Sequence, residues 1–307
     1  TQTISLRKPD INDVDLPEDI VNIECSDEVA LTEDGYPHPS VTGYPRVTTA
    51  YGTYDLAMTY CTLGAAFEDS DPIEVCESTY KVIRTWSIID WCVEPAQVTT
   101  YEQIIKVADT TPPVVSCNWP DTDWDGVGDM PVYSTGPFDC TATFPVAAPT
   151  VTDNCSDYVW YVDVIVIEEV NTYNQWGQVT GTEVSEQVHA SYGPLGAAES
   201  GPYVTNVPMS LYGNHYLHYT VEDGCGNTTT YDCEFVVEDQ INPVAICDDD
   251  LNISIGGDGY ARVYAEDVDE GSNDNCELTL IEVRSAGGDW GSYVGFVWGD
   301  GHELCTL

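Results

Sequence analysis

The sequence contains one phrase twice. Residues 109–117 read DTTPPVVSC and residues 239–247 read DQINPVAIC, so an Asp, a Pro, a Val and a Cys recur in register. Two shorter phrases recur around each copy in the same order, at 84–92 and 217–225 and at 153–155 and 274–276. Such self-similarity marks a chain of repeated modules, and the spacing exceeds the roughly 20–50 residues of solenoid repeats. Each repeat should therefore be a domain with its own core.

The repeated phrases divide the chain into modules at 1–108, 109–238 and 239–307. The third module stops early, and the first lacks the full Asp-Pro-Pro opening, so we expect these residues to be a slice of a longer array. No secretion signal stands at the start, and no apolar run reaches about 18 residues. We therefore expect no membrane insertion in this segment.

The charge balance is strongly acidic, with 53 Asp and Glu against 8 Lys and Arg and a net charge of −45. Such a surface makes nucleic acid and anionic membranes poor partners. The chain is nevertheless 42% hydrophobic and 11% aromatic, so a core can form. The charge has two explanations: solubility in a salty medium, where repulsion is screened, or binding of divalent cations. The local acidic patterns favour cations.

The 12 cysteines indicate disulfides and an extracellular location, secreted or on a cell surface. None forms a CxxC pair, which disfavours zinc ribbons and thioredoxin-type sites. The second module holds five cysteines and the third holds three, so we expect bridges across a module border or partners outside the slice. Cys155 with Cys225 is the expected pair, because both stand in repeated phrases.

The hydrophobic periodicity is two, as at residues 82–89, and β-branched and aromatic runs at 97–108 and 158–170 have strand composition. Frequent Gly and Pro separate the runs, and no capped amphipathic stretch predicts a long helix. The expected fold is all-β, a tandem of immunoglobulin-like β-sandwich modules. The module junctions carry Pro and no Gly, so they should be short and stiff and make the array an elongated rod.

An acidic loop at residues 121–129, DTDWDGVGD, carries the strongest chemical signal. Alternating carboxylates before a Gly allow a tight loop to aim several oxygens at one Ca²⁺. It is not an EF-hand, because Val132 stands where the bidentate Glu would be. The loop resembles those of thrombospondin type-3 repeats, which implies side-chain ligation by Asp121, Asp123, Asp125 and Asp129 and carbonyl ligation by Val127. The alternative is an exposed loop whose acids are solvated.

A weaker acidic cluster lies in the third module, where Asp267 and Asp269 with Asp274 form a second candidate metal site; a solvated acidic face is the alternative.

Enzyme motifs are missing from the sequence: there is no HExxH, GxSxG or phosphate-binding glycine loop. His215 and His218 are three apart in a predicted strand and should point to opposite faces. We expect the chain not to be an enzyme.

The phrases at 109–117, 149–155 and 219–227 resemble, in the same order, those of the hyalin repeat (HYR) module. The first module is similar to repeats of giant secreted surface proteins of Bacteroidota, including gliding adhesins. The resemblance implies an immunoglobulin-like fold and a role in adhesion or as a structural spacer, and it implies no catalytic residues. It departs at residues 170–201, an insertion with no counterpart in a minimal module.

Two functions remain open. The first is a structural array of modules stabilised by bound calcium and by disulfides. It would form the shaft of an adhesin or filamentous surface appendage and assemble as a homo-oligomer or fibre. The second is a module that binds other cell surfaces, glycans or proteins. It would use the insertion at 175–203 or the tryptophans Trp119, Trp124, Trp290 and Trp298.

Overall fold

The computed structural model describes residues 8–56, 62–248, 252, 254, 256–257, 263–278, 280–281, 283–284 and 305–306. The chain forms two compact units. Unit 1 comprises Thr1–Val115, Val151–Trp160 and Thr220–Thr229, and unit 2 comprises Ser116–Thr150, Tyr161–Tyr219 and Thr230–Leu307. Unit 1 therefore combines the predicted first module with three segments of the predicted second module, at residues 109–115, 151–160 and 220–229. The helical segments of the described residues are short, namely η1 (Ile11–Asp13), α1 (Pro39–Thr42) and α2 (Ala265–Val268).

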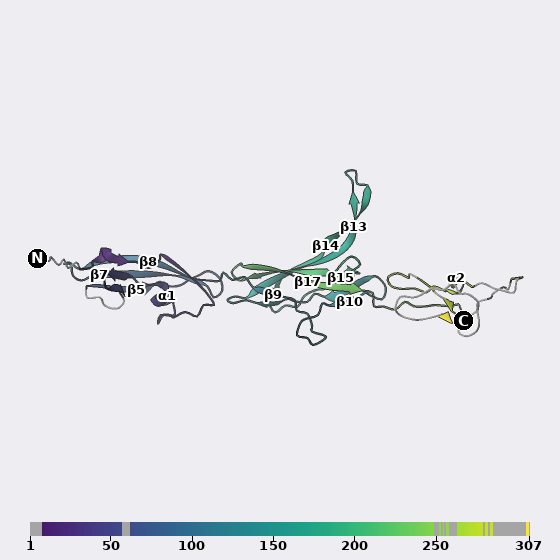
Figure 1. The fold of residues 1–307 in the computed structure, drawn as a ribbon, viewed down its shortest axis with the longest axis horizontal. Coiled ribbons are helices and arrows are strands. Elements are labelled where there is room, and N and C mark those ends of the chain that lie inside the picture. Colours follow the sequence, from purple (N-terminus) through teal and green to yellow (C-terminus); the bar gives the residue numbers. More distant parts are fainter. Residues whose placement is uncertain are drawn as a thin grey trace. The chain divides into compact units, whose positions relative to one another are not determined.

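The described residues up to Ala108 of unit 1 form two sheets (Figure 1). The larger has the order β2-β8-β7-β5, with β6 also paired to β7, and its strands are β2 (Ile20–Glu24), β5 (Leu63–Asp69), β6 (Ile73–Glu74), β7 (Tyr80–Asp90) and β8 (Gln97–Ala108). The smaller has the order β1-β3-β4, with strands β1 (Val14–Asp15), β3 (Arg46–Thr49) and β4 (Gly52–Asp55). The alternation along β7 buries every second side chain, as the period of two predicts.

The core of unit 1 lies between these two sheets. Val47 of the smaller sheet packs with Leu63 and Ile88 of the larger one, and Leu56 completes the buried cluster. Ile11, Val14 and Ala65 pack against it from the side. Two sheets that share one apolar core form a β-sandwich. The predicted all-β sandwich architecture is therefore confirmed for this part of the chain.

The second large sheet has the order β10-β17-β16-β13-β14. Its strands are β10 (Val132–Ser134), β13 (Tyr158–Tyr173), β14 (Val179–Gly196), β16 (His215–Asp223) and β17 (Thr228–Glu238). Two small sheets accompany it: β11 (Thr141–Pro145) with β15 (Tyr203–Pro208), and β12 (Thr150–Thr152) with β9 (Val114–Ser116). Figure 1 shows the β13–β14 hairpin projecting beyond the sheet, where the sequence has its unmatched insertion.

Aromatic side chains join β11 to the large sheet. Phe144 of β11 stacks on Tyr133 of β10 at 3.7 Å between ring centroids and meets Phe235 of β17 edge-on at 5.2 Å. Tyr219 of β16 is buried and donates to the Ala147 carbonyl at 2.6 Å.

Beyond residue 239, the described elements are α2 and the pair β18 (Val283–Arg284) and β19 (Cys305–Thr306). No helix among the described residues is long and apolar enough to span a membrane.

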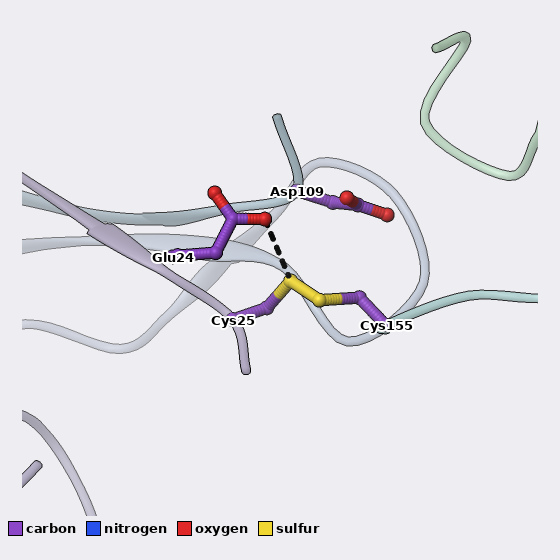
Figure 2. A group of neighbouring side chains, drawn as sticks. All are labelled: Glu24, Cys25, Asp109 and Cys155. Carbon is purple, nitrogen blue, oxygen red and sulfur yellow. Dashed lines mark hydrogen bonds between the residues drawn. A yellow bond between two sulfur atoms is a disulfide. The ribbon is translucent and has the colours of Figure 1, made fainter. Parts of the chain in front are cut away.

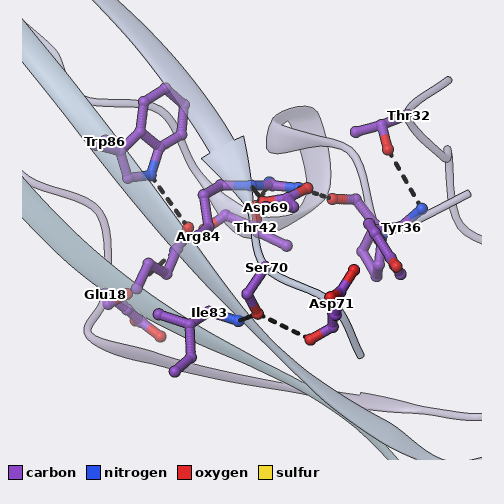
Figure 3. Close-up of polar contacts among 12 residues, drawn as sticks. Glu18, Thr32, Tyr36, Thr42, Asp69, Ser70, Asp71, Ile83, Arg84 and Trp86 are labelled. Carbon is purple, nitrogen blue, oxygen red and sulfur yellow. Dashed lines mark hydrogen bonds and ion pairs between the residues drawn. The ribbon is translucent and has the colours of Figure 1, made fainter. Parts of the chain in front are cut away.

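A buried ion pair lies in the core of unit 1 (Figure 3). Arg84 of β7 is fully buried and binds both carboxylate oxygens of Asp69, each at 2.7 Å. Its remaining donors reach Thr42 Oγ1 at 2.9 Å and the Pro37 carbonyl at 2.8 Å, and Phe67 lies 4.4 Å from the guanidinium carbon. Sequence reasoning did not single out this pair.

The two histidines of β16 point to opposite faces of the sheet, as predicted: His215 is buried and His218 is partly exposed. His215 Nδ1 accepts from the Ile167 N–H at 3.0 Å, and Nε2 faces the Pro208 carbonyl at 3.0 Å. These partners require the neutral ring with its proton on Nε2. Burial is the main cause that lowers the pKa of His215, against the opposing influence of the Pro208 carbonyl and Glu168.

We expect this histidine to make stability depend on pH. A pKa that is lower in the folded than in the unfolded state stabilises the fold above the unfolded value of about 6.5, and this contribution is lost as pH falls through the folded pKa. The free energy of unfolding of the wild type, relative to His215→Gln, should therefore decrease below about pH 6.5, by on the order of 1 kcal/mol. Urea titrations of both proteins from pH 7.5 to pH 5 measure it, and a constant difference would contradict the expectation.

Candidate metal centre

The acidic loop brings three of its aspartates together. Carboxylate oxygens of Asp121, Asp123 and Asp129 lie within 4.8 Å of one another. The loop closes where the Asp129 N–H donates to the Pro120 carbonyl at 2.9 Å. A Cβ on Gly128 would lie 2.6 Å from the Trp119 carbonyl oxygen, so this close approach requires glycine. The predicted convergence therefore holds for three of the four predicted carboxylates.

The fourth predicted carboxylate has a different contact. Asp125 is not in the converging group, and its Oδ1 accepts from the Val127 N–H at 2.8 Å. Asp121 accepts from the N–H groups of Trp124 at 2.6 Å and Gly126 at 2.9 Å, which winds the loop around its carboxylate. Thr122 donates to Asp129 through its hydroxyl and its N–H, and the hydroxyl bond is the main cause that lowers the pKa of Asp129. Carbonyl ligation by Val127 stays a prediction.

A second acidic group lies where the repeated phrases meet. Asp109 follows β8, Asp153 follows β12 and Asp223 ends β16, and their carboxylate oxygens also lie within 4.8 Å of one another. Asp109 is only 7% exposed and Asp223 only 5% exposed, unlike the aspartates of the loop. Sequence reasoning used all three as landmarks of the repeat and assigned none of them as a ligand. Their shared place in repeated phrases was the signal that could have found them.

The group is held by backbone donors of its own turns. Asp153 Oδ2 accepts from the N–H groups of Cys155 and Ser156, at 3.0 and 2.9 Å. Asp223 Oδ1 accepts from the N–H groups of Cys225 and Asn227, at 2.8 and 2.9 Å. Asp153 Oδ1, in contrast, is buried and has no hydrogen-bond partner. This carboxylate therefore keeps unused acceptor capacity inside the protein.

The electrostatics of this second group are unfavourable without a counter-ion. Burial raises the pKa of Asp109, and the negative charges of Asp223 and Asp153 raise it further, against the lowering influence of the Ser156 and Thr111 hydrogen bonds. Two carboxylates about 5 Å apart repel by roughly 3 kcal/mol at an effective dielectric constant near 20. The sequence has no Lys or Arg between residues 107 and 261. Among the described residues no Lys or Arg forms an ion pair with these three aspartates, so their neutralisation requires a cation from solution or a proton.

Glu24 and a disulfide adjoin Asp109 (Figure 2). Glu24 accepts from the Thr110 hydroxyl at 2.6 Å, which is the main cause that lowers its pKa, and from Asn154 Nδ2 at 3.1 Å. Cys25 and Cys155 beside it are joined through their sulfurs. Because disulfide sulfurs are poor metal ligands, Glu24 and Asp109 are the groups of this cluster that offer oxygen to a cation.

The disulfides correct one prediction and confirm another. Cys155 pairs with Cys25 and Cys225 pairs with Cys76, so the predicted Cys155–Cys225 bridge is wrong. Both cysteines instead reach back to the first 108 residues of the sequence. The expectation of bridges across predicted module borders is confirmed by these two and by Cys140–Cys276, whereas Cys117–Cys233 stays within the second module.

The second predicted metal site is not gathered among the described residues. Asp267 accepts from the Tyr264 N–H at 2.9 Å, Asp269 from the Ser272 N–H at 2.8 Å, and Asp274 from the Cys276 N–H at 3.1 Å. These three carboxylates form no converging group like the two described above. Each accepts within its own turn, so the structure does not bring the three together as one site.

The tryptophans of the binding hypothesis that the structure describes lie in two segments, the connection between β9 and β10 and the turn between β13 and β14. Trp124 is 90% exposed in the acidic loop, and Trp176 is 75% exposed in the turn between β13 and β14. Trp119 is partly exposed before the loop. Trp290 and Trp298 lie outside the described residues. The exposed tryptophans therefore do not come from one continuous segment.

No family model matches the sequence, and no curated protein matches it. Among solved structures, the chain is similar to one described as "PcdhgB3 EC1-4 in 50 mM HEPES", with 13% sequence identity and a TM-score of 0.25. The match covers 78% of this chain and 54% of that one, so the chain spans about half the length of the structure it matches. A likeness of this size does not define a function.

Proposed function

We propose that this chain is a calcium-binding, non-enzymatic structural segment of an extracellular adhesion-type protein. The observation that carries the proposal is the convergence of Asp121, Asp123 and Asp129 in a stretch of sequence without Lys or Arg. Calcium prefers six to eight oxygen ligands, and carboxylates in a tight loop supply them at low cost in chain entropy. Magnesium fits less well, because it gives up its water reluctantly.

The four disulfides between described residues support the extracellular part of the proposal, because such bridges persist in oxidising compartments. The repeated phrases support a large repetitive parent protein, and their resemblance to hyalin repeats of Bacteroidota surface proteins supports a shaft or filament. Cations that neutralise the acidic surface would also allow copies of the chain to associate as a homo-oligomer or fibre, since a charge of −45 otherwise opposes association.

A glycan- or protein-binding role is the second candidate. It is favoured by the 75% exposure of Trp176 and the 61% exposure of Tyr173 at the end of the projecting hairpin. Aromatic side chains held on a structured turn are common in recognition surfaces, since they offer large contact area with little loss of conformational entropy. The Asn174 side chain accepts from the N–H groups of Trp176 and Gln178, which orders this turn.

The loop predicts calcium-dependent stability. Calcium at a hundredfold excess over Kd should stabilise the fold by about 2.7 kcal/mol through one site, so EDTA should lower Tm. The triple variant Asp121→Asn, Asp123→Asn, Asp129→Asn should lose the contribution of the loop. Terbium, which takes similar oxygen ligands, should luminesce through Trp124 in the wild type and not in the triple variant.

Asp125→Asn is the matched control, because Asp125 lies in the same loop but outside the converging group. It should keep the terbium signal, whereas loss of that signal would restore Asp125 as a ligand. Melting curves that coincide in EDTA and in millimolar calcium would overturn the proposed function.

A further inference from the structure

We propose that Asp109, Asp153 and Asp223 form a separate divalent-cation site, and that it clamps the turns that carry two of the disulfides. The choice of calcium as the ion rests on the proposed function. The site itself is independent of the acidic loop, because it shares no residue with it and consists of different segments of the chain.

Burial distinguishes this group from ordinary acidic clusters. Asp109 and Asp223 are more than nine-tenths buried, whereas unpaired surface acids turn into solvent. Buried polar atoms nearly always find a partner, and Asp153 Oδ1 has none among the protein's donors. The equivalent oxygen in the next copy of the phrase, Asp274 Oδ1, is also buried and without a partner. The same unsatisfied oxygen therefore occurs at the same place in both copies of the repeat.

Protein donors do not neutralise the group. The hydrogen bonds to Asp153 and Asp223 come from neutral backbone and amide groups, and those to Asp109 come from the Ser156 hydroxyl at 3.1 Å and the Thr111 N–H at 3.3 Å. These donors orient the carboxylates without cancelling their charge. A cation bound by several oxygens would coordinate the buried Asp153 oxygen and also neutralise the repulsion between the carboxylates. A water molecule could donate a hydrogen bond to that oxygen but would not neutralise the charges.

The same short turn positions both a carboxylate and a cysteine. In each Asp-x-Cys sequence the Asp side chain accepts from the N–H of the Cys two residues later, at 3.0 Å for Asp153 and 2.8 Å for Asp223. The turn thus presents its carboxylate to the acidic group and its sulfur to a partner cysteine, Cys25 or Cys76. A cation that holds both turns would fix the geometry of both bridges.

The variant Asp153→Asn separates a cation site from a merely structural cluster. Asn keeps an oxygen for the two backbone donors, removes one of three like charges and supplies an NH₂ donor in place of the unpartnered oxygen. In EDTA its Tm should therefore equal or exceed that of the wild type. In calcium its gain in Tm should be smaller, because a ligand is lost.

Calorimetric titration of the full 307-residue chain with calcium alone measures the site directly. The triple loop variant should still bind calcium, and adding Asp153→Asn should weaken that remaining binding at least tenfold. Asp157→Asn is the matched control, because Asp157 is exposed and near in sequence but outside the group; it should leave the affinity within about twofold.

The outcomes keep the two proposals apart. A triple loop variant that binds no calcium would overturn the site of Asp109, Asp153 and Asp223 and leave the loop site standing. Calcium binding that survives the loop substitutions but falls with Asp153→Asn would support the site of Asp109, Asp153 and Asp223, even if the loop binds nothing. An Asp153→Asn protein that is less stable in EDTA, with an unchanged gain in calcium, would show that the cluster is only structural.

Discussion

Replacing Cys25 and Cys155 together by Ser should lower the free energy of unfolding by about 3–5 kcal/mol. The bridge joins residues 130 apart in the sequence, and closing so long a loop removes much of the entropy of the unfolded chain. The second bridge, Cys76–Cys225, spans 149 residues and interleaves with the first. Neither of the two loops closed by these bridges lies inside the other. Once one bridge has formed, the other therefore still closes a long loop, and both bridges should contribute to the free energy of unfolding.

Urea denaturation without reductant, with unfolding monitored by tryptophan fluorescence, measures this change in the free energy of unfolding. Both cysteines are replaced together so that neither is left as an unpaired partner thiol. The control is the Cys117→Ser, Cys233→Ser pair, which removes a bridge of similar span, 116 residues, inside the predicted second module. Both pairs should lose stability, but only loss of Cys25–Cys155 should also weaken calcium binding at the aspartates beside it. A change below about 1 kcal/mol, or a non-reducing peptide map that joins Cys155 to Cys225, would contradict the pairing.

The failed disulfide prediction has a physical cause. Cys155 and Cys225 stand in equivalent Asp-x-Cys turns, and the sequence shows this equivalence but not the direction of either sulfur. The N–H of each Cys donates to its own Asp, so the carboxylates converge while the sulfurs bond elsewhere. Repetition along a chain thus indicates shared turn geometry, and it does not indicate that the repeated cysteines pair with each other.

The all-β architecture could be predicted because it depends on local signals: alternation along β7 and the Gly- and Pro-rich turns between strands. The convergence of carboxylates in the acidic loop could be predicted for the same reason, since they lie within nine residues of sequence. The group of Asp109, Asp153 and Asp223 could not, because pairing of distant strands brings it together. The β12–β9 pairing and the central place of β16 are properties of the sheets that no short window of sequence contains.

The contacts of the buried Arg84 could not be predicted either, because they also join residues distant in the sequence. Replacing Arg84 is the second change from which we expect a large loss of stability. Arg84→Met should destabilise the fold by about 3–5 kcal/mol, because it leaves the Asp69 carboxylate, 2% exposed, without its partner. Asp69→Leu alone should cost a similar amount, since it strands a guanidinium that has no exposure to solvent. Arg84→Lys should also be costly, because a single ammonium cannot bind both carboxylate oxygens and the two groups on α1 and its flank.

The double variant Arg84→Met, Asp69→Leu decides what the pair does. Paired burial of two charges is often no more stable than apolar side chains of similar volume, so the double variant should recover most of the loss of either single one. A coupling free energy of about 2–4 kcal/mol from the double-mutant cycle, measured by urea denaturation, would support this account. The exposed pair Arg46–Asp55 is the control, at the same 2.7 Å, and it should couple by less than about 1 kcal/mol. Additive losses at Arg84 and Asp69 would mean that each side chain acts through its other contacts, with Thr42 and the Pro37 carbonyl as the partners that matter.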